Sequence, residues 1–293
     1  MKFFILVLLT LLGCVTCRYH ERFQSQSLRV IFFDVGQGDA ALVRFPGGEV
    51  WLIDSGPGFR DWDVGKKELL LELARLGVRT IDRAILSHPD EDHAMGYRGL
   101  FEQMNVLEWN YHERLNSRAF SRPVMREISL IAHKRNISTR ALSLEERGPG
   151  YRLIPLRSVP ALTNDQGLVV HLTYGNCDVL FTGDIEAAGE AAPLPKVNRK
   201  IAFLKVAHHG SKTSSAERLL QRWQPRLAVI SVGKQNIYGH PHVSVLERLK
   251  HWGSRVLRTD FHGFVSITID PDGSFFCESF KGNCGTGRCL PAE

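Results

Sequence analysis

The most constraining feature of this chain is an apolar segment that runs directly into a cluster of potential metal ligands. Residues 81–87 are mostly apolar and predict a short buried strand. Four potential ligands follow within six residues, namely His88, Asp90, Asp92 and His93. Imidazole and carboxylate together suit Zn²⁺, Mn²⁺ or Fe²⁺, and a divalent cation relieves the repulsion between crowded carboxylates. The segment therefore predicts a metal site, with a solvated acidic turn as the alternative.

Three later clusters of polar side chains also follow predicted strands. They contain Asp184, the adjacent pair His208 and His209, and His240, which opens a predicted helix. Strand ends and the loops beyond them are where α/β folds place their chemistry. A single histidine is more often structural, but four such clusters in one chain favour a shared pocket that binds metal.

The predicted strands outnumber the predicted helices, and the helices are spaced between them. Strands are expected at residues 28–34, 40–45, 49–54, 81–87, 168–174, 178–182, 201–206, 227–232, 254–258 and 264–269, and helices at residues 66–76, 122–135, 215–223 and 243–252. This order predicts the α/β class, with mixed sheets covered by helices. With 293 residues, 43% hydrophobic and 23% charged, the chain can bury a sizeable core; this composition excludes a disordered tail, a collagen-like fibre and a multi-span membrane protein.

The amino terminus predicts export. One lysine precedes an apolar run from Phe3 to Gly13, which is short for a hydrocarbon layer of about 30 Å but typical of an export signal. Residues 1–17 are therefore expected to be an export signal that directs the protein to the bacterial cell envelope. The residues that end at Cys14 resemble a lipobox, which would make Cys14 a lipidation site; a cleaved signal and an uncleaved anchor are the alternatives.

Three of the six cysteines lie in residues 271–293, which we expect to form a Cys-rich C-terminal tail. An exported chain meets an oxidising compartment, so a disulfide between two of Cys277, Cys284 and Cys289 is expected. A zinc site built from cysteines is the alternative, although the spacing fits no common zinc module. The sequence does not fix the pairing.

Positive charge is concentrated in the middle of the chain. The formal net charge is +6, and residues 112–157 contain ten Lys or Arg against four Asp or Glu, an excess equal to that of the whole chain. The segment is either a solvated helical face or a basic surface that holds a polyanion.

The motifs in combination resemble the metallo-β-lactamase superfamily, and within it the C-terminal hydrolase domain of ComEC-type proteins of bacterial DNA uptake. The segments that carry the resemblance are Asp34-Val35-Gly36-Gln37-Gly38-Asp39-Ala40, Leu52-Ile53-Asp54-Ser55-Gly56, the HPDEDH segment from His88 to His93, Phe181-Thr182-Gly183-Asp184, Leu204-Lys205-Val206-Ala207-His208-His209-Gly210-Ser211 and Tyr238-Gly239-His240-Pro241. The resemblance covers nearly the whole chain after the signal, so residues 28–270 are expected to form one hydrolase domain.

This resemblance implies a four-layer αββα sandwich with one or two divalent ions, Zn or Mn, at one edge of its two sheets. By matching positions, His88 and Asp90 would bind the first metal, Asp92 and His93 the second, Asp184 would bridge them, and His240 would be the last ligand. Many members carry a further histidine before the Gly-Asp strand; the nearest candidates at that place are Asn164 and Asp165.

The resemblance also implies roles around the metals. His208 and His209 would protonate the leaving group or contact phosphate, with Asp92 completing the expected catalytic set. Ser211 and Lys212 would contact an anionic oxygen. The remaining expected residues are acids that orient ligating imidazoles: Asp34, Asp39 and Asp54.

The implied function is that of an exported metal-dependent hydrolase, a phosphodiesterase or nuclease in which two cations share an attacking hydroxide. The expected partner is an anionic substrate such as single-stranded nucleic acid, with membrane association through a lipid anchor or an uncleaved signal. Two alternatives stay open. One is hydrolysis of a lactone, thioester or β-lactam on the same fold, and the other is a non-catalytic DNA-binding protein of the envelope.

Overall fold

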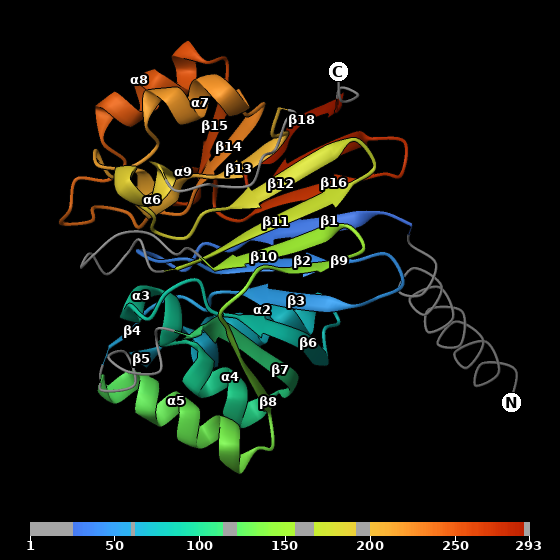
Figure 1. Ribbon diagram of the computed structural model, residues 1–293, viewed down its shortest axis with the longest axis vertical. Coiled ribbons are helices and arrows are strands. Elements are labelled where there is room, and N and C mark those ends of the chain that lie inside the picture. Colours follow the sequence, from blue (N-terminus) through green and yellow to red (C-terminus); the bar gives the residue numbers. More distant parts are fainter. Residues whose placement is uncertain (1–25, 60–61, 114–121, 156–166, 192–199, 290–293) are drawn as a thin grey trace, which may run out of the picture.

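Two β-sheets packed face to face form the centre of the computed structural model, which describes residues 26–59, 62–113, 122–155, 167–191 and 200–289 (Figure 1). In spatial order, the larger sheet contains β18 (Gly282–Arg288), β17 (Ser274–Ser279), β16 (Val265–Ile269), β1 (Leu28–Phe32), β2 (Ala41–Arg44), β3 (Val50–Ile53), β6 (Thr80–Ile85), β7 (Asn105–His112) and β8 (Ser138–Leu142). The smaller sheet contains β15 (Arg255–Arg258), β14 (Leu227–Ile230), β13 (Phe203–Lys205), β12 (Cys177–Phe181), β11 (Leu168–Tyr174), β10 (Tyr151–Pro155) and β9 (Glu146–Gly148). A separate two-stranded ribbon pairs β4 (Gly58–Phe59) with β5 (Trp62–Asp63).

Helices cover the outer face of each sheet. The larger sheet is covered by η1 (Gly65–Leu69), α2 (Leu70–Arg75), α4 (Tyr97–Gln103) and α5 (Pro123–Lys134), and the smaller by α7 (Glu217–Trp223) and α8 (Val243–His251) (Figure 1). Four shorter helical turns lie in the loops at the strand ends: α3 (Glu91–Ala94), α6 (Ala187–Ala191), η5 (Ala207–Gly210) and α9 (Thr259–His262). The expected four-layer αββα sandwich is therefore confirmed.

The strands read as continuous apolar runs because both of their faces are buried. In β1, Val30 and Phe32 point into the core between the sheets, whereas Ile31 packs under the helices of the larger sheet. In β12, Val179 joins the central core and Leu180 faces α7 and α8. Successive side chains on a strand point to opposite faces, so a strand in the middle of a layered fold must be apolar at nearly every position.

The helices pack through one apolar face each. In α5, Val124 and Ile128 are buried four residues apart, and in α8 the same spacing buries Val245 and Leu249. Residues four apart lie on the same face of an α-helix. Each helix therefore buries a stripe against its sheet and leaves its polar face in water.

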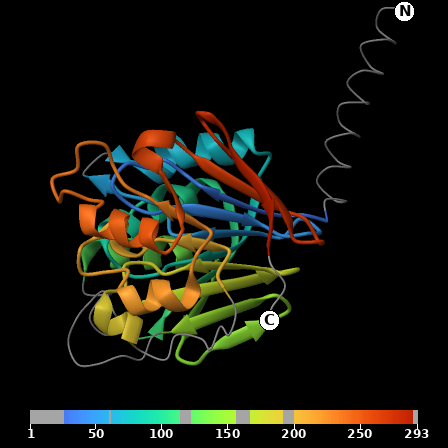
Figure 2. The same ribbon diagram turned by 90° about the horizontal axis from the view of Figure 1, so that it is seen from above.

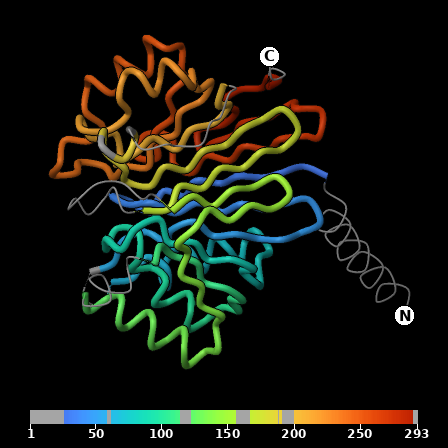
Figure 3. The backbone as a smooth tube through the Cα atoms, viewed as in Figure 1, coloured from blue at the N-terminus to red at the C-terminus, as the bar shows by residue number. Residues whose placement is uncertain are grey.

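The C-terminal residues continue the larger sheet. Residues 271–293, which the sequence sets apart as a Cys-rich tail, contain β17 and β18, and these strands extend the sheet beyond β16. The red end of the chain and the blue strand β1 belong to the same sheet (Figure 3), in which β16 pairs directly with β1 and separates it from β17 and β18. The two ends of the described chain thus meet in one sheet.

Two disulfides fix this C-terminal region. Cys277 and Cys284 join β17 to β18, and Cys177 in the smaller sheet is bonded to Cys289, which follows β18. The expected disulfide is therefore present, accompanied by a second that links the two sheets, and these four sulfurs cannot form the alternative zinc site. Cys14 and the rest of residues 1–17 lie outside the described residues. Within the described ranges, every helix is too short or too polar to cross a bilayer.

The two disulfides are expected to differ in their contribution to stability. The Cys177→Ala/Cys289→Ala double substitution should lower the free energy of unfolding by up to about 5 kcal/mol, and Cys277→Ala/Cys284→Ala by about 2 kcal/mol. The first bridge joins residues 112 apart and the second residues 7 apart, so opening the first releases more chain entropy in the unfolded state. Denaturant unfolding followed by circular dichroism measures both losses; equal losses would contradict this account.

Candidate metal centre

The polar clusters predicted from the sequence meet at one end of the sandwich. The loop after β6 carries Asp92 and His93 on α3, the turn after β12 carries Asp184, and η5 after β13 carries His209. In Figure 1 the short helices α3 and α6 lie at the same end of the molecule, and the turned view in Figure 2 keeps the yellow α6 at that end. Strands β12, β13 and β14 are parallel, which brings the loops that follow them to one sheet edge.

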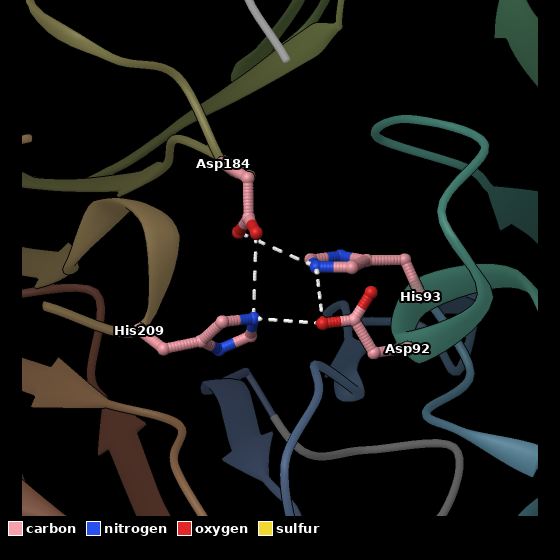
Figure 4. A group of neighbouring side chains, drawn as sticks. All are labelled: Asp92, His93, Asp184 and His209. Atoms are coloured by element: carbon pink, nitrogen blue, oxygen red, sulfur yellow. Dashed lines mark hydrogen bonds and ion pairs between the residues drawn. The ribbon is translucent and has the colours of Figure 1, made fainter. Parts of the chain in front are cut away.

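Four side chains from these loops converge on one point (Figure 4). His93 Nε2 lies 3.3 Å from Asp184 Oδ1 and 4.0 Å from Asp92 Oδ2. His209 Nε2 lies 3.3 Å from Asp184 Oδ2 and 3.2 Å from Asp92 Oδ2. The ligand atoms of all four residues lie within 4.8 Å of one another. We call Asp92, His93, Asp184 and His209 the central cluster.

The two imidazoles of the central cluster are held by their outer nitrogens. His93 Nδ1 lies 2.8 Å from Asp54 Oδ2, and His209 Nδ1 lies 2.9 Å from the carbonyl oxygen of Ser231. Because a carbonyl oxygen only accepts, the Nδ1–H of His209 donates to it, and a carboxylate accepts from His93 in the same way. Both rings therefore present Nε2 to the centre, in the tautomer that a metal ligand requires.

The residues present fit a divalent metal ion. Three buried atoms that face the centre have no hydrogen-bond partner among the described residues: His88 Nε2, His93 Nε2 and Asp184 Oδ1. A buried polar atom without a partner costs free energy. Imidazole nitrogen and carboxylate oxygen together are the donor set of zinc and of related divalent ions. A cation bound by the central cluster would satisfy the free nitrogen of His93 and the free oxygen of Asp184.

His88 also approaches the carboxylate of Asp184, and Asp90 lies beside His88. His88 Nε2 lies 3.8 Å from Asp184 Oδ2 and 3.7 Å from Asp90 Oδ2. Asp90 also forms an ion pair with Arg122, which would compete with a metal ion for the Asp90 carboxylate. Asp184 thus has His88, His93 and His209 around its carboxylate, and its role in bridging two metals stays a prediction.

Close backbone contacts hold the ligand loops together. A Cβ atom at Gly38 would lie 2.3 Å from the carbonyl oxygen of Asp92, and one at Gly96 would lie 2.0 Å from that of Ser55. Glycine at these positions lets the segments that flank the site approach one another. The sequence signal for this arrangement is the Gly-rich segment that ends at Asp39, whose amide donates to the Asp92 carbonyl over 3.1 Å.

Three site residues adopt left-handed backbone conformations. Asp54 has φ 57°, His208 has φ 49° and His209 has φ 51°. This conformation is unfavourable in free energy for residues other than glycine. It therefore persists only where surrounding contacts stabilise it. The His208 amide donates to the Gly183 carbonyl over 3.2 Å, and the Asp54 amide to that of Ile85 over 2.8 Å. These bonds help to hold the turns that aim Asp54 and His209 into the centre.

The carboxylates control the charge of the imidazoles in the metal-free protein. Burial opposes the charged form of His209, but Asp184 and Asp92 outweigh it and raise the pKa of His209 to about 10. Burial likewise opposes the charge of His93, yet Asp184 and Asp54 hold its pKa well above the ordinary value. His88 differs, because burial and the neighbouring His93 lower its pKa. Protons on two histidines thus balance carboxylate charge, and a metal ion has to displace them.

The sequence did not indicate Lys205 as part of the site. Its side chain is 4% exposed, pairs with Asp39, donates to the Gly183 carbonyl over 3.1 Å and lies 3.6 Å from Asp184 Oδ1. Burial disfavours the ammonium ion, but Asp39 and Asp184 raise its pKa above the ordinary value. The available signal was a lysine in an otherwise apolar strand, which requires a buried partner.

The other expected residues occupy different places. His209 belongs to the central cluster, whereas the ring of His240 lies 6.4 Å from that of His209 and 5.7 Å from that of His208. Asp54 contacts the imidazole of His93 as expected, Asp39 pairs with Lys205 instead, and Asp34 is exposed and lies near Lys234. Ser211 is hydrogen-bonded to Thr213, Lys212 is exposed, and Asn164 and Asp165 lie outside the described residues.

Metal binding is expected to stabilise the protein through the central cluster. Adding Zn²⁺ or Mn²⁺ to chelator-treated protein at about 100 times its Kd should stabilise it by about 2.7 kcal/mol and raise Tm by roughly 5 °C. His209→Gln should abolish the shift, whereas His240→Gln should retain most of it, because the structure groups His209 with the other ligands. His251→Gln, an exposed residue on α8, is the control for adventitious binding. A shift lost in His240→Gln and kept in His209→Gln would contradict this assignment.

Comparisons with known proteins identify the family to which the chain belongs. The family model described as the metallo-beta-lactamase superfamily matches residues 33–234. ComE operon protein 3 of Bacillus subtilis (strain 168) is 33% identical over 260 residues, which cover 80% of this chain and 32% of that protein. Recombination protein 2 of Haemophilus influenzae is 31% identical over 263 residues, which cover 89% of this chain and 31% of that protein. The chain therefore spans about a third of the length of these curated relatives.

A solved structure shares the fold. The metallo-beta-lactamase fold protein YhfI from Bacillus subtilis aligns with 78% of this chain and 95% of its own at a TM-score of 0.51 and 12% identity. The resemblance to ComEC-like competence and recombination proteins, stated above from the motifs, is confirmed by the sequence matches. Because the family model covers more than half of the chain and its residues include Asp92, His93, Asp184 and His209, this protein belongs to the metallo-β-lactamase superfamily.

Proposed function

We propose that this member of a metallo-hydrolase family cleaves phosphodiester bonds, with single-stranded nucleic acid as its substrate class. The observation that carries the proposal is the central cluster, in which carboxylates and imidazoles from distant parts of the chain present free ligand atoms to one point. Burying these charges costs desolvation free energy, which a bound metal ion used in catalysis would explain.

The roles of the residues follow from their positions. The central cluster would hold one metal ion, and His88 and Asp90 with Asp184 would hold a second. Bound divalent cations supply Lewis-acid activation of water and stabilise charge on a phosphoryl oxygen. Asp54 and Ser231 orient the two imidazoles, and their contacts keep both Nε2 atoms aimed at the centre.

His208 is placed to protonate the leaving oxygen. Its ring lies at the edge of the site with 23% of the side chain exposed, Nδ1 lies 3.3 Å from Glu186 Oε1, and Nε2 lies 3.8 Å from Asp184 Oδ2. A carboxylate beside one nitrogen of a histidine orients the ring, so that Nε2 of His208 faces the site. We therefore assign the general-acid role to His208 and a ligand role to its neighbour His209.

The support for nucleic acid comes from the relatives and from the site. Two matched proteins carry the names Recombination protein 2 and Competence protein ComA, which point to processes that involve DNA. Exposed Lys212 follows the histidine pair and can contact a phosphate. The basic segment of residues 112–157 gives weaker support, because Arg140 pairs with Glu146 at 2.7 Å and Arg147 with Glu145 at 2.9 Å.

We also propose that the protein acts in the bacterial cell envelope. The apolar run from Phe3 to Gly13 supports export, and Cys14 supports a lipid anchor as the mode of membrane association, with an uncleaved signal as the other mode. The disulfides Cys177–Cys289 and Cys277–Cys284 add support, because such bonds persist in oxidising compartments.

Hydrolysis is expected to require the shared carboxylate. Asp184→Asn should lower kcat/KM for bis-p-nitrophenyl phosphate and for single-stranded DNA by about 100-fold or more, because it removes a charge from both sets of ligands. The control is Asp272→Asn, an exposed acid in the turn between β16 and β17 that pairs with Arg288. A lactone, a thioester and a β-lactam are assayed in parallel. Turnover of one of these alone, or salt-sensitive DNA binding without turnover, would contradict the proposal.

The loss of rate on removing the general acid is expected to depend on the leaving group. His208→Gln should lower kcat for single-stranded DNA by about 100-fold or more, since an alkoxide leaves poorly without a proton. Bis-p-nitrophenyl phosphate should lose less than about 10-fold, because p-nitrophenolate needs no protonation. Single-turnover rates on both substrates, with His251→Gln as the control, measure the difference. Equal losses on both would assign His208 to phosphate binding instead.

A further inference from the structure

We propose that Tyr238 is a stacking platform for a nucleobase at the mouth of the metal centre. This inference rests on the proposed function and specifies how its substrate is held. It concerns a part of the structure that the metal site and the acid–base chemistry do not use, namely the loop of residues 234–239 between β14 and α8.

Three rings form a ladder from the central cluster to solvent. The ring of His240 lies 6.4 Å from that of His209, with 27° between the planes, and the ring of Tyr238 lies 5.8 Å from that of His240, with 25° between the planes. Such separations and near-parallel planes are typical of stacked aromatic pairs. Exposure increases along the ladder, since His209 is buried, His240 is partly buried and Tyr238 is 65% exposed. The last ring therefore has room for another flat group in solvent.

The loop that carries Tyr238 is held by one side chain. Asn236 Nδ2 donates to the carbonyl oxygens of Gly233 over 3.1 Å and His240 over 2.7 Å, and Asn236 Oδ1 accepts from the His240 amide over 2.9 Å. These bonds tie the two ends of the loop together. Tyr238 is thus presented at a fixed place before any ligand arrives, which lowers the entropy cost of binding.

The exposed side chains in this loop are not explained by stability. Ile237, beside Tyr238, is 91% exposed, so the loop offers two neighbouring apolar side chains to solvent at the edge of a polar site. Neighbouring exposed apolar groups of this kind mark binding surfaces more often than chance. The exposed cation Lys234 begins the same loop, near Asp34, and the exposed cation Lys212 follows the histidine pair.

A nucleobase fits this surface better than other flat groups do. Each phosphate of a nucleic acid strand is flanked by two nucleosides, so a phosphate held at the central cluster necessarily brings bases close to it. Proteins that bind single strands without sequence preference combine basic side chains with aromatic platforms, because every base has a flat apolar face. Tyr238 would bind a base of any sequence, and double-stranded substrate would first have to expose one.

The test compares oligonucleotides that differ in their bases alone. Fluorescence anisotropy in the His208→Gln background, which slows cleavage but keeps the metal ligands, measures Kd for a single-stranded oligonucleotide and for an abasic oligonucleotide of the same length and charge. Tyr238→Ala should weaken binding of the first by about 5- to 150-fold and leave that of the second unchanged, whereas Tyr238→Phe and Tyr238→Trp should keep both. Phe276→Ala, which removes a 40% exposed ring on β17, is the matched control. Photocrosslinking of an oligonucleotide that contains 5-iodouracil should label Tyr238.

The outcomes separate this inference from the proposed function. Equal weakening of both oligonucleotides by Tyr238→Ala, or none, would overturn the platform, while cleavage of single-stranded DNA by the unmodified protein would leave the proposed function standing. Failure of the unmodified protein to bind or cleave single-stranded DNA would overturn both. Tyr238→Ala should retain the metal-dependent rise in Tm of the unmodified protein, which shows that the variant is folded and still binds metal.

Discussion

The repulsion between buried carboxylates is the constraint on which the rest of this structure depends. Asp39, Asp54 and Asp184 are all 5% exposed or less, and Asp92 adds a fourth negative charge beside them. Such a group is stable only when positive charge and hydrogen bonds compensate it. Lys205 provides a fixed positive charge, and His93 and His209 provide charges that depend on protons. A divalent cation would replace those protons, so metal binding and the electrostatic balance of the site are linked.

Both sheets supply the charged residues that compensate one another. Asp54 and the segment with Asp92 and His93 follow strands of the larger sheet, whereas Asp184, Lys205 and His209 follow or end strands of the smaller sheet. The site therefore exists only when the sheets pack against each other through their shared apolar core. Core packing and metal binding support one another, because displacement of either sheet would separate the ligands from their partners.

The motifs of the sequence predicted the fold and most of the site. Strands end directly before the ligands, and the observed helix Pro123–Lys134 lies within the predicted residues 122–135. The structure brings Asp92, His93 and Asp184 together with His88 nearby and Asp90 beside His88, and their roles as ligands stay predictions. It differs at the last ligand, where His209 is in the cluster and His240 is not, since the left-handed turn at His208 and His209 and the carbonyl of Ser231 aim His209 inward. Asp34 could not be distinguished in sequence from Asp39, five residues later, yet one is exposed and the other is buried against Lys205.

The alternation of strands and helices and a candidate metal site of carboxylates and imidazoles could be predicted from the sequence, because apolar runs and the spacing of His88 to His93 are local properties of the chain. The folded structure was needed to show that His209 completes the cluster, that Lys205 balances Asp39, and that Cys289 bonds to Cys177 in the other sheet. These choices depend on distances between residues far apart in the chain, such as the 117 residues that separate Asp92 from His209. Local pattern carries no information about such distances, which packing alone sets.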